Sequence, residues 1–263
     1  MWTVDAFDVD FLKWDFNRSF TEAGSMGGRT DVRRVFVEHA LGTQRVLDRL
    51  RTARPALRIG ACSGGGGRID LASLARTDQA WTSDNTDAVD RLTIQHGFPQ
   101  VYPAQVMGAW VTDSPNPYTR RSVPLGFRFH NAMAGVLGVG GDLTRWSAEA
   151  LDAAAGFVAR YKAVRETVQH GDKYRLGAPG DAWQAVQYVA GNDVESVVLQ
   201  WRPGPTGDMP VPRLRLHGLD LQAVYHVDDD TGRSRPTPFA PARRSPRTGW
   251  RRNCRAGRTR AGC

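Results

Sequence analysis

The chain has 263 residues, of which 41% are hydrophobic and 24% charged, enough for one large domain or two ordinary ones with a substantial core. No apolar run reaches the roughly 18 residues of a membrane helix, and the acidic start MWTVDAFDVDF lacks the basic region of a signal peptide, so no membrane partner is expected. The three cysteines and six histidines have no metal-binding or disulfide spacing, which argues against a metal site and favours a reducing, cytoplasmic setting, while the net charge of +8 comes from one terminal segment.

The first predicted strand, DFLKWD at 10–15, begins a stretch with two different faces. Because strand side chains alternate with period two, FLKWDFNR presents an apolar face and a polar face. The apolar face consists of Leu12, Trp14 and Phe16. The polar face consists of Lys13, Asp15 and Asn17. A sheet has no structural use for such a polar triplet, which therefore indicates a functional site.

Alternating strand and helix patterns continue to about residue 169. Ser147 is the predicted N-cap of the last helix. Alternating strands and helices imply a parallel sheet, either open and doubly wound or closed into a barrel. Hydrophobic spacing predicts, in chain order, a helix at 33–51, strands at 56–62 and 79–84, a helix at 86–97, a strand and loop at 99–110, a helix leading to a short strand at 124–138, and a long helix at 144–169.

After about residue 172 the pattern becomes antiparallel. DAWQAVQYVA and ESVVLQWRP alternate, and Gly191-Asn192-Asp193 between them predicts a hairpin. RLRLHGLDLQAVYHV continues the alternation, and GDKYRLGAPG bridges the two regions. The predicted organisation is a domain of strands and helices at 1–162 and a small antiparallel domain at 172–230.

The last segment, 231–263, contains ten arginines and no acidic residue, so residues 1–230 carry a net charge of 8 − 10 = −2. Rich in Arg, Pro, Gly and Ala and without hydrophobic period, this tail is predicted to be disordered. The simplest interpretation is a solvated tail, while a basic arm for nucleic acid and a shifted reading frame of GC-rich DNA are the alternatives. The abrupt change of composition after QAVYHVDDD favours the shifted frame over the basic arm, so no nucleic-acid partner is expected.

Two aspartates end predicted strands at a spacing that places them together. Asp15 and Asp84 are 69 residues apart, and an eight-unit barrel uses roughly 31 residues per unit, so the two carboxylates fall at one rim, two strands apart. Paired carboxylates at that rim suit glycoside hydrolysis. The alternative is structural: Asp15 pairs with Lys13, and Asp84 or Asp87 caps the following helix.

The glycine run CSGGGGR, 62–68, follows the second predicted strand. A Walker phosphate loop would need Gly-Lys-Ser/Thr, which is absent. A dinucleotide fingerprint would need a helix that starts within the glycines and an acid about 20 residues on, so Asp84 leaves a weak match open. Four glycines also form a flexible turn, and they allow backbone N–H groups to approach a ligand closely.

Taken together, FLKWDFNR, CSGGGGRID, QAWTSDNTDAVDRLTIQHG, YPAQVMGAWV and PLGFRFHNAMAGVLG occur in an order and at spacings that resemble the alpha-galactosidases of glycoside hydrolase family 36, the melibiases. The resemblance covers about residues 1–230. It implies the C-terminal part of a TIM (β/α)8 barrel, about strands four to eight, followed by a small antiparallel β-sandwich-like domain. Gly60 and Trp110 depart from the family pattern, where glutamate and histidine are common.

The resemblance also implies roles for individual residues. Asp15 would be the nucleophile and Asp84 the acid/base of a double displacement that retains the anomeric configuration. No cofactor or metal is implied. The residues implied to bind galactose are Lys13, Asn17, Cys62, Ser63, Gly64 and Gly65.

Further expectations concern the whole protein. The family's N-terminal β-sandwich and first three barrel strands cannot be placed here, so the chain is expected to be a truncated alpha-galactosidase, of doubtful activity alone, acting on melibiose- or raffinose-type oligosaccharides. Full-length relatives are expected to be homo-oligomers. The alternatives are an inactive sugar-binding remnant and a galactosyl transferase of the raffinose-synthase type.

Overall fold

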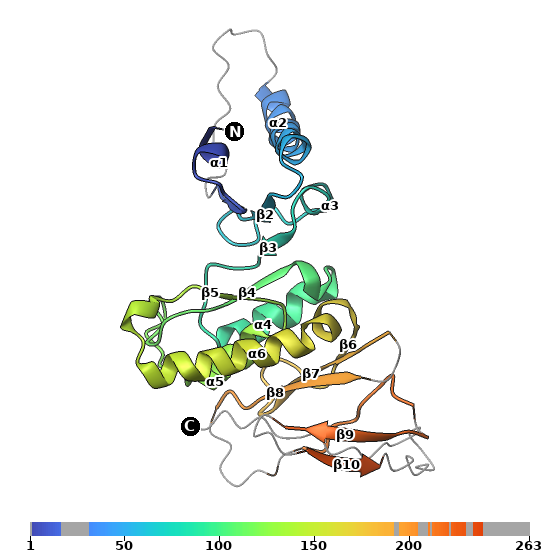
Figure 1. Cartoon of the computed structure of the whole chain (residues 1–263). Helices are drawn as coiled ribbons and strands as arrows, with labels where there is room; N and C mark the ends of the chain where they lie inside the picture. Colours follow the sequence, from blue (N-terminus) through green and yellow to red (C-terminus); the bar gives the residue numbers. More distant parts are fainter. Residues whose placement is uncertain are drawn as a thin grey trace. The chain divides into compact units, whose positions relative to one another are not determined.

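The computed structural model describes residues 2–16, 32–191, 195–204, 210, 212–220, 222–229 and 234–238. The chain divides into two compact units (Figure 1). The first contains Met1–Asp84 and Val106–Gly108, and the second contains Asn85–Gln105 and Ala109–Cys263. Within the described ranges no helix is both long and apolar enough to cross a membrane.

The predicted parallel sheet is confirmed. It has five strands in the order β1-β2-β3-β4-β5, so each strand pairs with the next strand along the chain. This order, with helices between the strands, is that of part of a (β/α) barrel. The strands are β1 (Phe11–Trp14), β2 (Arg58–Ala61), β3 (Gln79–Trp81), β4 (Met107–Val111) and β5 (Val136–Val139).

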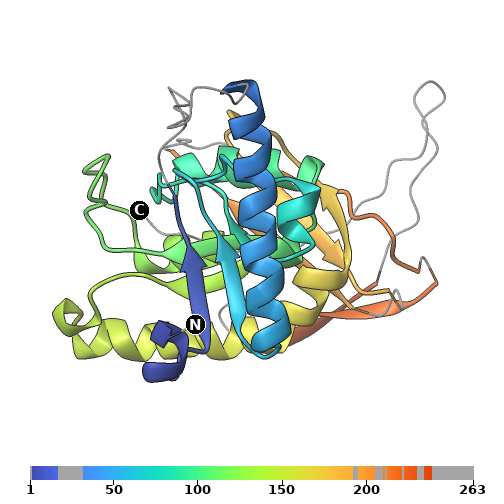
Figure 2. The same ribbon diagram turned by 90° about the horizontal axis from the view of Figure 1, so that it is seen from above.

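In the first unit the long helix α2 (Val32–Ala53) packs beside β1 and β2 (Figure 2). Leu12 and Trp14 of β1 pack against a core that includes Leu47 and Ile59, so the predicted apolar face of this strand is confirmed. Phe16 differs: it lies beyond the end of the strand and is 42% exposed. Two short helices, α1 (Trp2–Ala6) and α3 (Leu71–Leu74), were not predicted from the sequence.

In the second unit the helices pack around two clusters of apolar side chains. The backbone N–H of Ala150 donates to Ser147 Oγ at 3.2 Å, which confirms the predicted N-cap of the longest helix. The helices of this part are α4 (Asp90–Gly97), η1 (Phe98–Gln100), η2 (Ala104–Val106), α5 (Leu125–Ala132), η3 (Leu143–Arg145) and α6 (Ala148–His170).

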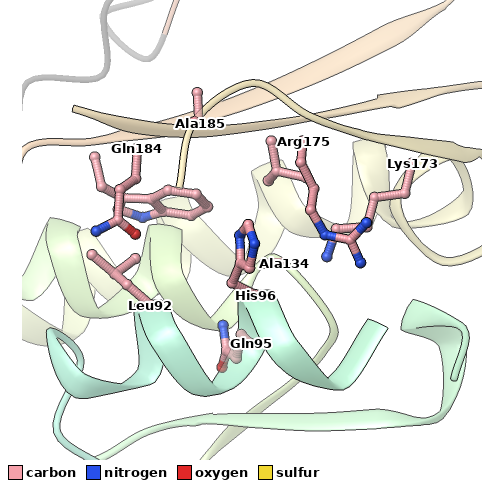
Figure 3. Close-up of a pocket in the computed structure, with 11 residues that line it drawn as sticks. Leu92, Gln95, His96, Ala134, Lys173, Arg175, Gln184 and Ala185 are labelled. Carbon is pink, nitrogen blue, oxygen red and sulfur yellow. The ribbon is translucent and has the colours of Figure 1, made fainter. Parts of the chain in front are cut away.

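The central strand β7 of the antiparallel sheet β6-β7-β8 is buried on both faces. β7 (Gln184–Val189) and β8 (Ser196–Trp201) form the predicted hairpin, and β6 (Asp172–Arg175) pairs with β7. One face packs on the helices α4 and α6 through side chains such as Tyr188. Figure 3 shows Leu92 and His96 of α4 close to Gln184 of this sheet. The other face packs on Leu214 and Leu216. The segment predicted as a bridge, GDKYRLGAPG, therefore contains a strand of this sheet.

Two sequence predictions near the C-terminus need correction. Residues 213–219 bury Leu214, Leu216 and Leu219 but form no strand, because the backbone of His217 bonds to the side-chain amide of Gln187 and not to a strand backbone. The next strand is β9 (Val224–Asp228). β10 (Ser234–Pro238) pairs antiparallel with β9, so ordered structure enters the segment predicted to be disordered. The rest of that predicted tail, 239–263, lies outside the described residues.

Candidate active site

Three consecutive parallel strands bring the predicted site residues together at their carboxyl ends. Asp15 directly follows β1, and Cys62 directly follows β2. The backbone N–H of Cys62 donates to the carbonyl of Trp14 at 2.9 Å, which continues the pairing of β1 and β2 as far as the site. Asp15 is exposed, as a residue that receives a ligand must be. Asn17 lies outside the described residues.

The thiol of Cys62 lies against Asp15. Cys62 is only 2% exposed, and burial raises the pKa of its thiol, with a smaller increase from its hydrogen bond to the Asp15 carboxylate. The backbone N–H of Gly65 and the charge of Lys13 lower this pKa without reversing the shift. A neutral thiol donates to a carboxylate, so Cys62 holds the side chain of Asp15 and has little surface left for a sugar.

Asp84 is held by a residue that sequence reasoning missed. Trp81, the last residue of β3, donates its indole Nε1–H to Asp84 Oδ1 at 3.0 Å. The ammonium of Lys13 lies 5.2 Å from the centroid of the same indole ring. Trp81 therefore connects the lysine of the first strand with the aspartate that follows the third. Along QAWTSD the side chains of Ala80 and Trp81 point to opposite faces of the strand, and this alternation was the only feature of the sequence that indicated that Trp81 faces the site.

The glycine run is a turn that packs tightly against the backbone of Ser83 and Asp84. Gly64 and Gly65 have φ values of +53° and +84°, which side chains rarely adopt. A Cβ at Gly65 would lie 2.8 Å from the Cα of Ser83, so only glycine allows this approach. The Ser63 hydroxyl donates to the carbonyl of Phe16 at 2.7 Å. The next helix begins at Leu71, after the glycines, so the dinucleotide fingerprint is not met.

Arg68 is a second residue that sequence reasoning did not assign to the site. Its guanidinium donates to the carbonyl of Cys62 at 2.8 Å and stacks over the ring of Phe16 at 5.3 Å. It thereby fixes the ends of β1 and β2 relative to each other. Its position directly after four glycines was the only hint in the sequence.

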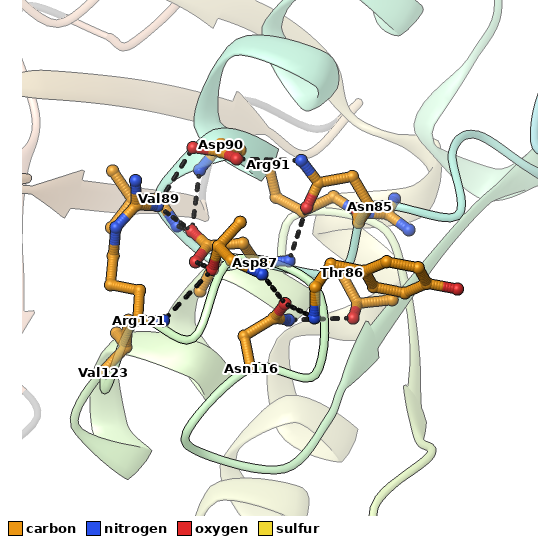
Figure 4. A network of polar contacts seen from close by, with 12 residues as sticks. Asn85, Thr86, Asp87, Val89, Asp90, Arg91, Asn116, Arg121 and Val123 are labelled. Atoms are coloured by element: carbon orange, nitrogen blue, oxygen red, sulfur yellow. Dashed lines mark hydrogen bonds and ion pairs between the residues drawn. The ribbon is translucent and has the colours of Figure 1, made fainter.

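The two aspartates of SDNTD, Asp84 and Asp87, have different structural positions. Asp87 Oδ1 accepts from the backbone N–H groups of Val89 and Asp90 at 2.9 and 3.1 Å, so the helix-capping alternative holds for Asp87 (Figure 4). Arg121 bridges Asp87 and Asp90, and the Thr119 hydroxyl donates to Asp87 Oδ2. Burial alone would raise the pKa of Asp87, but these hydrogen bonds and the Arg121 charge lower it overall.

Replacing the buried Asp87 should therefore destabilise the fold. In Asp87→Asn the charge that pairs with Arg121 is lost while the site stays buried, and we expect the free energy of unfolding to fall by about 1–3 kcal/mol. Because the pKa of Asp87 is lowered in the folded state, this contribution is present at neutral pH and is lost as the pH falls below about 4. Urea unfolding of both proteins at several pH values measures it. Asp152→Asn, at an exposed position of α6, should have little effect; an equal effect of both changes would contradict the prediction.

The two departures from the family pattern have neighbours that fit them. A Cβ at Gly60 would lie 2.9 Å from the ring of Phe11, so Phe11 occupies the space that a longer side chain would need. The indole of Trp110 lies 2.6 Å from where a Cβ of Gly138 or of Gly140 would stand. Among the described residues no three His, Cys, Asp or Glu side chains could together hold a metal ion.

A barrel-type sheet with aspartates after two of its parallel strands is typical of the barrel glycoside hydrolases. Residues 3–171 match the model of the family described as Melibiase, and residues 183–240 match the glycosyl hydrolase family 36 C-terminal domain. The chain belongs to the glycoside hydrolase family 36 alpha-galactosidases, the melibiases. The match extends to residue 240, beyond the limit of about 230 expected from the sequence.

Curated relatives and solved structures agree with this assignment. The chain is 37% identical over 228 residues to probable alpha-galactosidase C of Aspergillus terreus, covering 86% of this chain and 30% of that protein. It is 38% identical over 222 residues to alpha-galactosidase AgaA of Geobacillus stearothermophilus, covering 84% and 30%. A crystal structure of an AgaA variant with 1-deoxygalactonojirimycin matches with a TM-score of 0.82 at 35% identity, covering 90% of this chain and 34% of that chain. Other AgaA variants were crystallised with raffinose and with stachyose. The chain thus spans about 30% of the length of the curated relatives.

Proposed function

We propose that this chain carries the two catalytic carboxylates of a retaining alpha-galactosidase. The observation that supports the proposal most is the position of Asp15 and Asp84 after β1 and β3, with Cys62 after β2 between them. Neighbouring parallel strands end at one mouth of a barrel, where barrel enzymes have their active sites. Cys62 is hydrogen-bonded to the carboxylate of Asp15, and Trp81 is hydrogen-bonded to the carboxylate of Asp84, so each carboxylate is held in place by one neighbouring side chain.

In the proposed reaction Asp15 is the nucleophile. Its carboxylate attacks the anomeric carbon of a terminal alpha-galactosyl unit while Asp84, protonated at this stage, donates its proton to the departing oxygen. The products of this step are the shortened sugar and a galactosyl ester on Asp15. Asp84 then removes a proton from water, the water oxygen attacks the same carbon, and Asp15 is released.

The remaining binding residues are assigned by the same proposal. Lys13 and Asn17 flank the nucleophile, and Ser63, Gly64 and Gly65 supply backbone and hydroxyl groups to galactose, while Cys62 acts mainly by holding Asp15. The proposed substrates are alpha-galactoside oligosaccharides of the raffinose and stachyose type, because AgaA variants were crystallised with both sugars. A homo-oligomeric full-length protein and a cytoplasmic location stay predictions that rest on the family resemblance and on cysteine usage.

The experiment that tests the function uses a hybrid protein, in which the N-terminal part of AgaA precedes residues 1–263 of this chain. We expect the hybrid protein to hydrolyse an aryl alpha-galactoside with retention of configuration, followed by NMR of the released sugar. Transfer of galactose to sucrose in place of hydrolysis would favour a transferase, and sugar binding without turnover would favour a non-catalytic remnant; either outcome would overturn the proposal.

A polypeptide of residues 1–263 produced alone should behave differently from the hybrid protein. Within the described residues β1 and β5 are the end strands of the parallel sheet, and unpaired strand edges favour association with other chains. Galactose contacts from the rest of a barrel would also be missing, so orientation of the substrate is lost. We expect self-association in light scattering and no measurable hydrolysis. A monomer with a turnover of order 1–1000 per second would show that this prediction is wrong.

A further inference from the structure

A small cavity lies between helix α4 and one face of the sheet β6-β7-β8 (Figure 3). His96 projects from α4, and Lys173 and Arg175 project from β6 toward it. Lys173 and Arg175 alternate with Tyr174, which packs on the opposite face of the sheet. The cavity has a volume of about 30 Å³, more than the roughly 10–15 Å³ that one water requires.

Three of the side chains around this cavity are basic. Burial, together with a smaller effect of the Arg175 charge, lowers the pKa of Lys173 to about 7. Burial also lowers the pKa of His96, with additional effects of Arg175 and Lys173. Within the described part of the chain, no carboxylate is in an ion pair with Lys173 or Arg175. Three basic groups thus face one cavity without a compensating negative charge there.

A fourth polar group at this cavity, the indole N–H of Trp201, lacks a hydrogen-bond acceptor among the described residues. Trp201 lines the same cavity and is 6% exposed, and its indole Nε1–H has no hydrogen-bond partner among the described residues. A buried N–H without a partner costs about 1–3 kcal/mol. In the sheet register Trp201 pairs with Gln184, and Arg175 pairs with Val186. Because Gln184 and Val186 are two residues apart on β7, they share one face, and the side chains of Trp201 and Arg175 lie on that same face.

We propose that this pocket, formed by His96, Lys173, Arg175 and Trp201, binds a small inorganic oxyanion of the phosphate class. A guanidinium offers a rigid fork of N–H donors, an ammonium offers three, and an indole offers one, so the pocket presents several donors to an ion with several acceptor oxygens. A cation would be repelled by Arg175, whereas an anion would be attracted by it and would favour the charged forms of Lys173 and His96. Arg175 is exposed, so the ion can enter from solvent.

The site would connect the two parts of this unit. α4 follows the SDNTD motif, while β6 is the first strand of the antiparallel sheet. An anion held between His96 and Lys173 therefore stabilises the packing of that sheet on the helices. The chain has only three lysines, Lys13, Lys162 and Lys173, so the NMR signal of Lys173 can be resolved from those of the other two.

The test is thermal unfolding of the full 263-residue chain, alone and within the hybrid protein, at pH 7. With about 10 mM phosphate we expect a rise in Tm of about 2–4 °C relative to sodium chloride of equal ionic strength. Lys173→Met and Arg175→Gln should each weaken phosphate binding by about tenfold or more in calorimetry. The matched control is Lys162→Met, at an exposed position of α6, which should respond as the wild type does.

A second measurement keeps the result clear if a variant is unstable. With lysine labelled at ¹³Cε, the wild-type chain gives three signals, and Lys173→Met identifies the signal of Lys173. Phosphate should shift that signal and raise the pH at which it titrates, because a bound anion favours the ammonium form. Absence of any phosphate response in the wild type, an equal response to chloride, or an unchanged Lys173 signal would each overturn the proposal.

Discussion

Replacing Asp15 by asparagine in the hybrid protein should abolish nearly all hydrolysis of an aryl alpha-galactoside. An amide is a poor nucleophile, so the galactosyl ester on residue 15 cannot form, and we expect a loss of roughly 10³–10⁶-fold in kcat. The side chain keeps its size and can still accept from the Cys62 thiol, so the fold should be unchanged. Steady-state kinetics and the unfolding midpoint together separate loss of chemistry from loss of folding.

The matched control for this change is Asp10→Asn. Asp10 is exposed and precedes the same strand, β1, but it lies at the amino end of that strand, away from the carboxyl ends. We expect it to retain activity within about twofold. Wild-type turnover in Asp15→Asn, or an equal loss in both variants, would contradict the assignment of Asp15 as the nucleophile.

Much of the sheet could be predicted because its strands are short and separated by clear helical patterns. FLKWDFNR illustrates why: the alternation that places Leu12 and Trp14 on the core also places Lys13 and Asp15 on the opposite face. Period two is a local property of the chain and needs no knowledge of its neighbours. The same locality explains the correct N-cap at Ser147.

What could not be predicted depends on contacts between distant segments. The bond from Trp81 to Asp84 and the stacking of Arg68 on Phe16 need the relative positions of three strand ends, which no local pattern contains. Likewise SDNTD contains two aspartates suited to capping, and the contacts of Asp87 with Thr119 and Arg121, far along the chain, help to distinguish it from Asp84. β6 was predicted as a linker because DKYR is polar and stays partly exposed, although its backbone pairs with β7.

Replacing Asp84 by alanine should affect the two steps of the reaction differently, and the difference depends on the leaving group. For an oligosaccharide such as raffinose, departure of the sugar oxygen requires a proton, so we expect kcat to fall by about 10²–10⁴-fold in the hybrid protein. An aryl galactoside with an acidic phenol needs little protonation, so its first step should be nearly normal. The galactosyl ester on Asp15 then accumulates, because water has lost its general base, and a burst of phenol should precede slow turnover.

Azide provides the sharper test of Asp84. It is already an anion and needs no base, so it should attack the galactosyl ester in Asp84→Ala, raise the rate on the activated substrate, and yield an azide with the alpha configuration of the substrate. The comparison variant is Asp87→Asn, which should lose stability without any rescue by azide, since Asp87 caps α4 and is fully buried. If Asp84→Ala lost activity equally on all leaving groups and azide changed nothing, Asp84 would be a structural residue. If azide instead rescued Asp87→Asn, the roles assigned to the two aspartates of SDNTD would have to be exchanged.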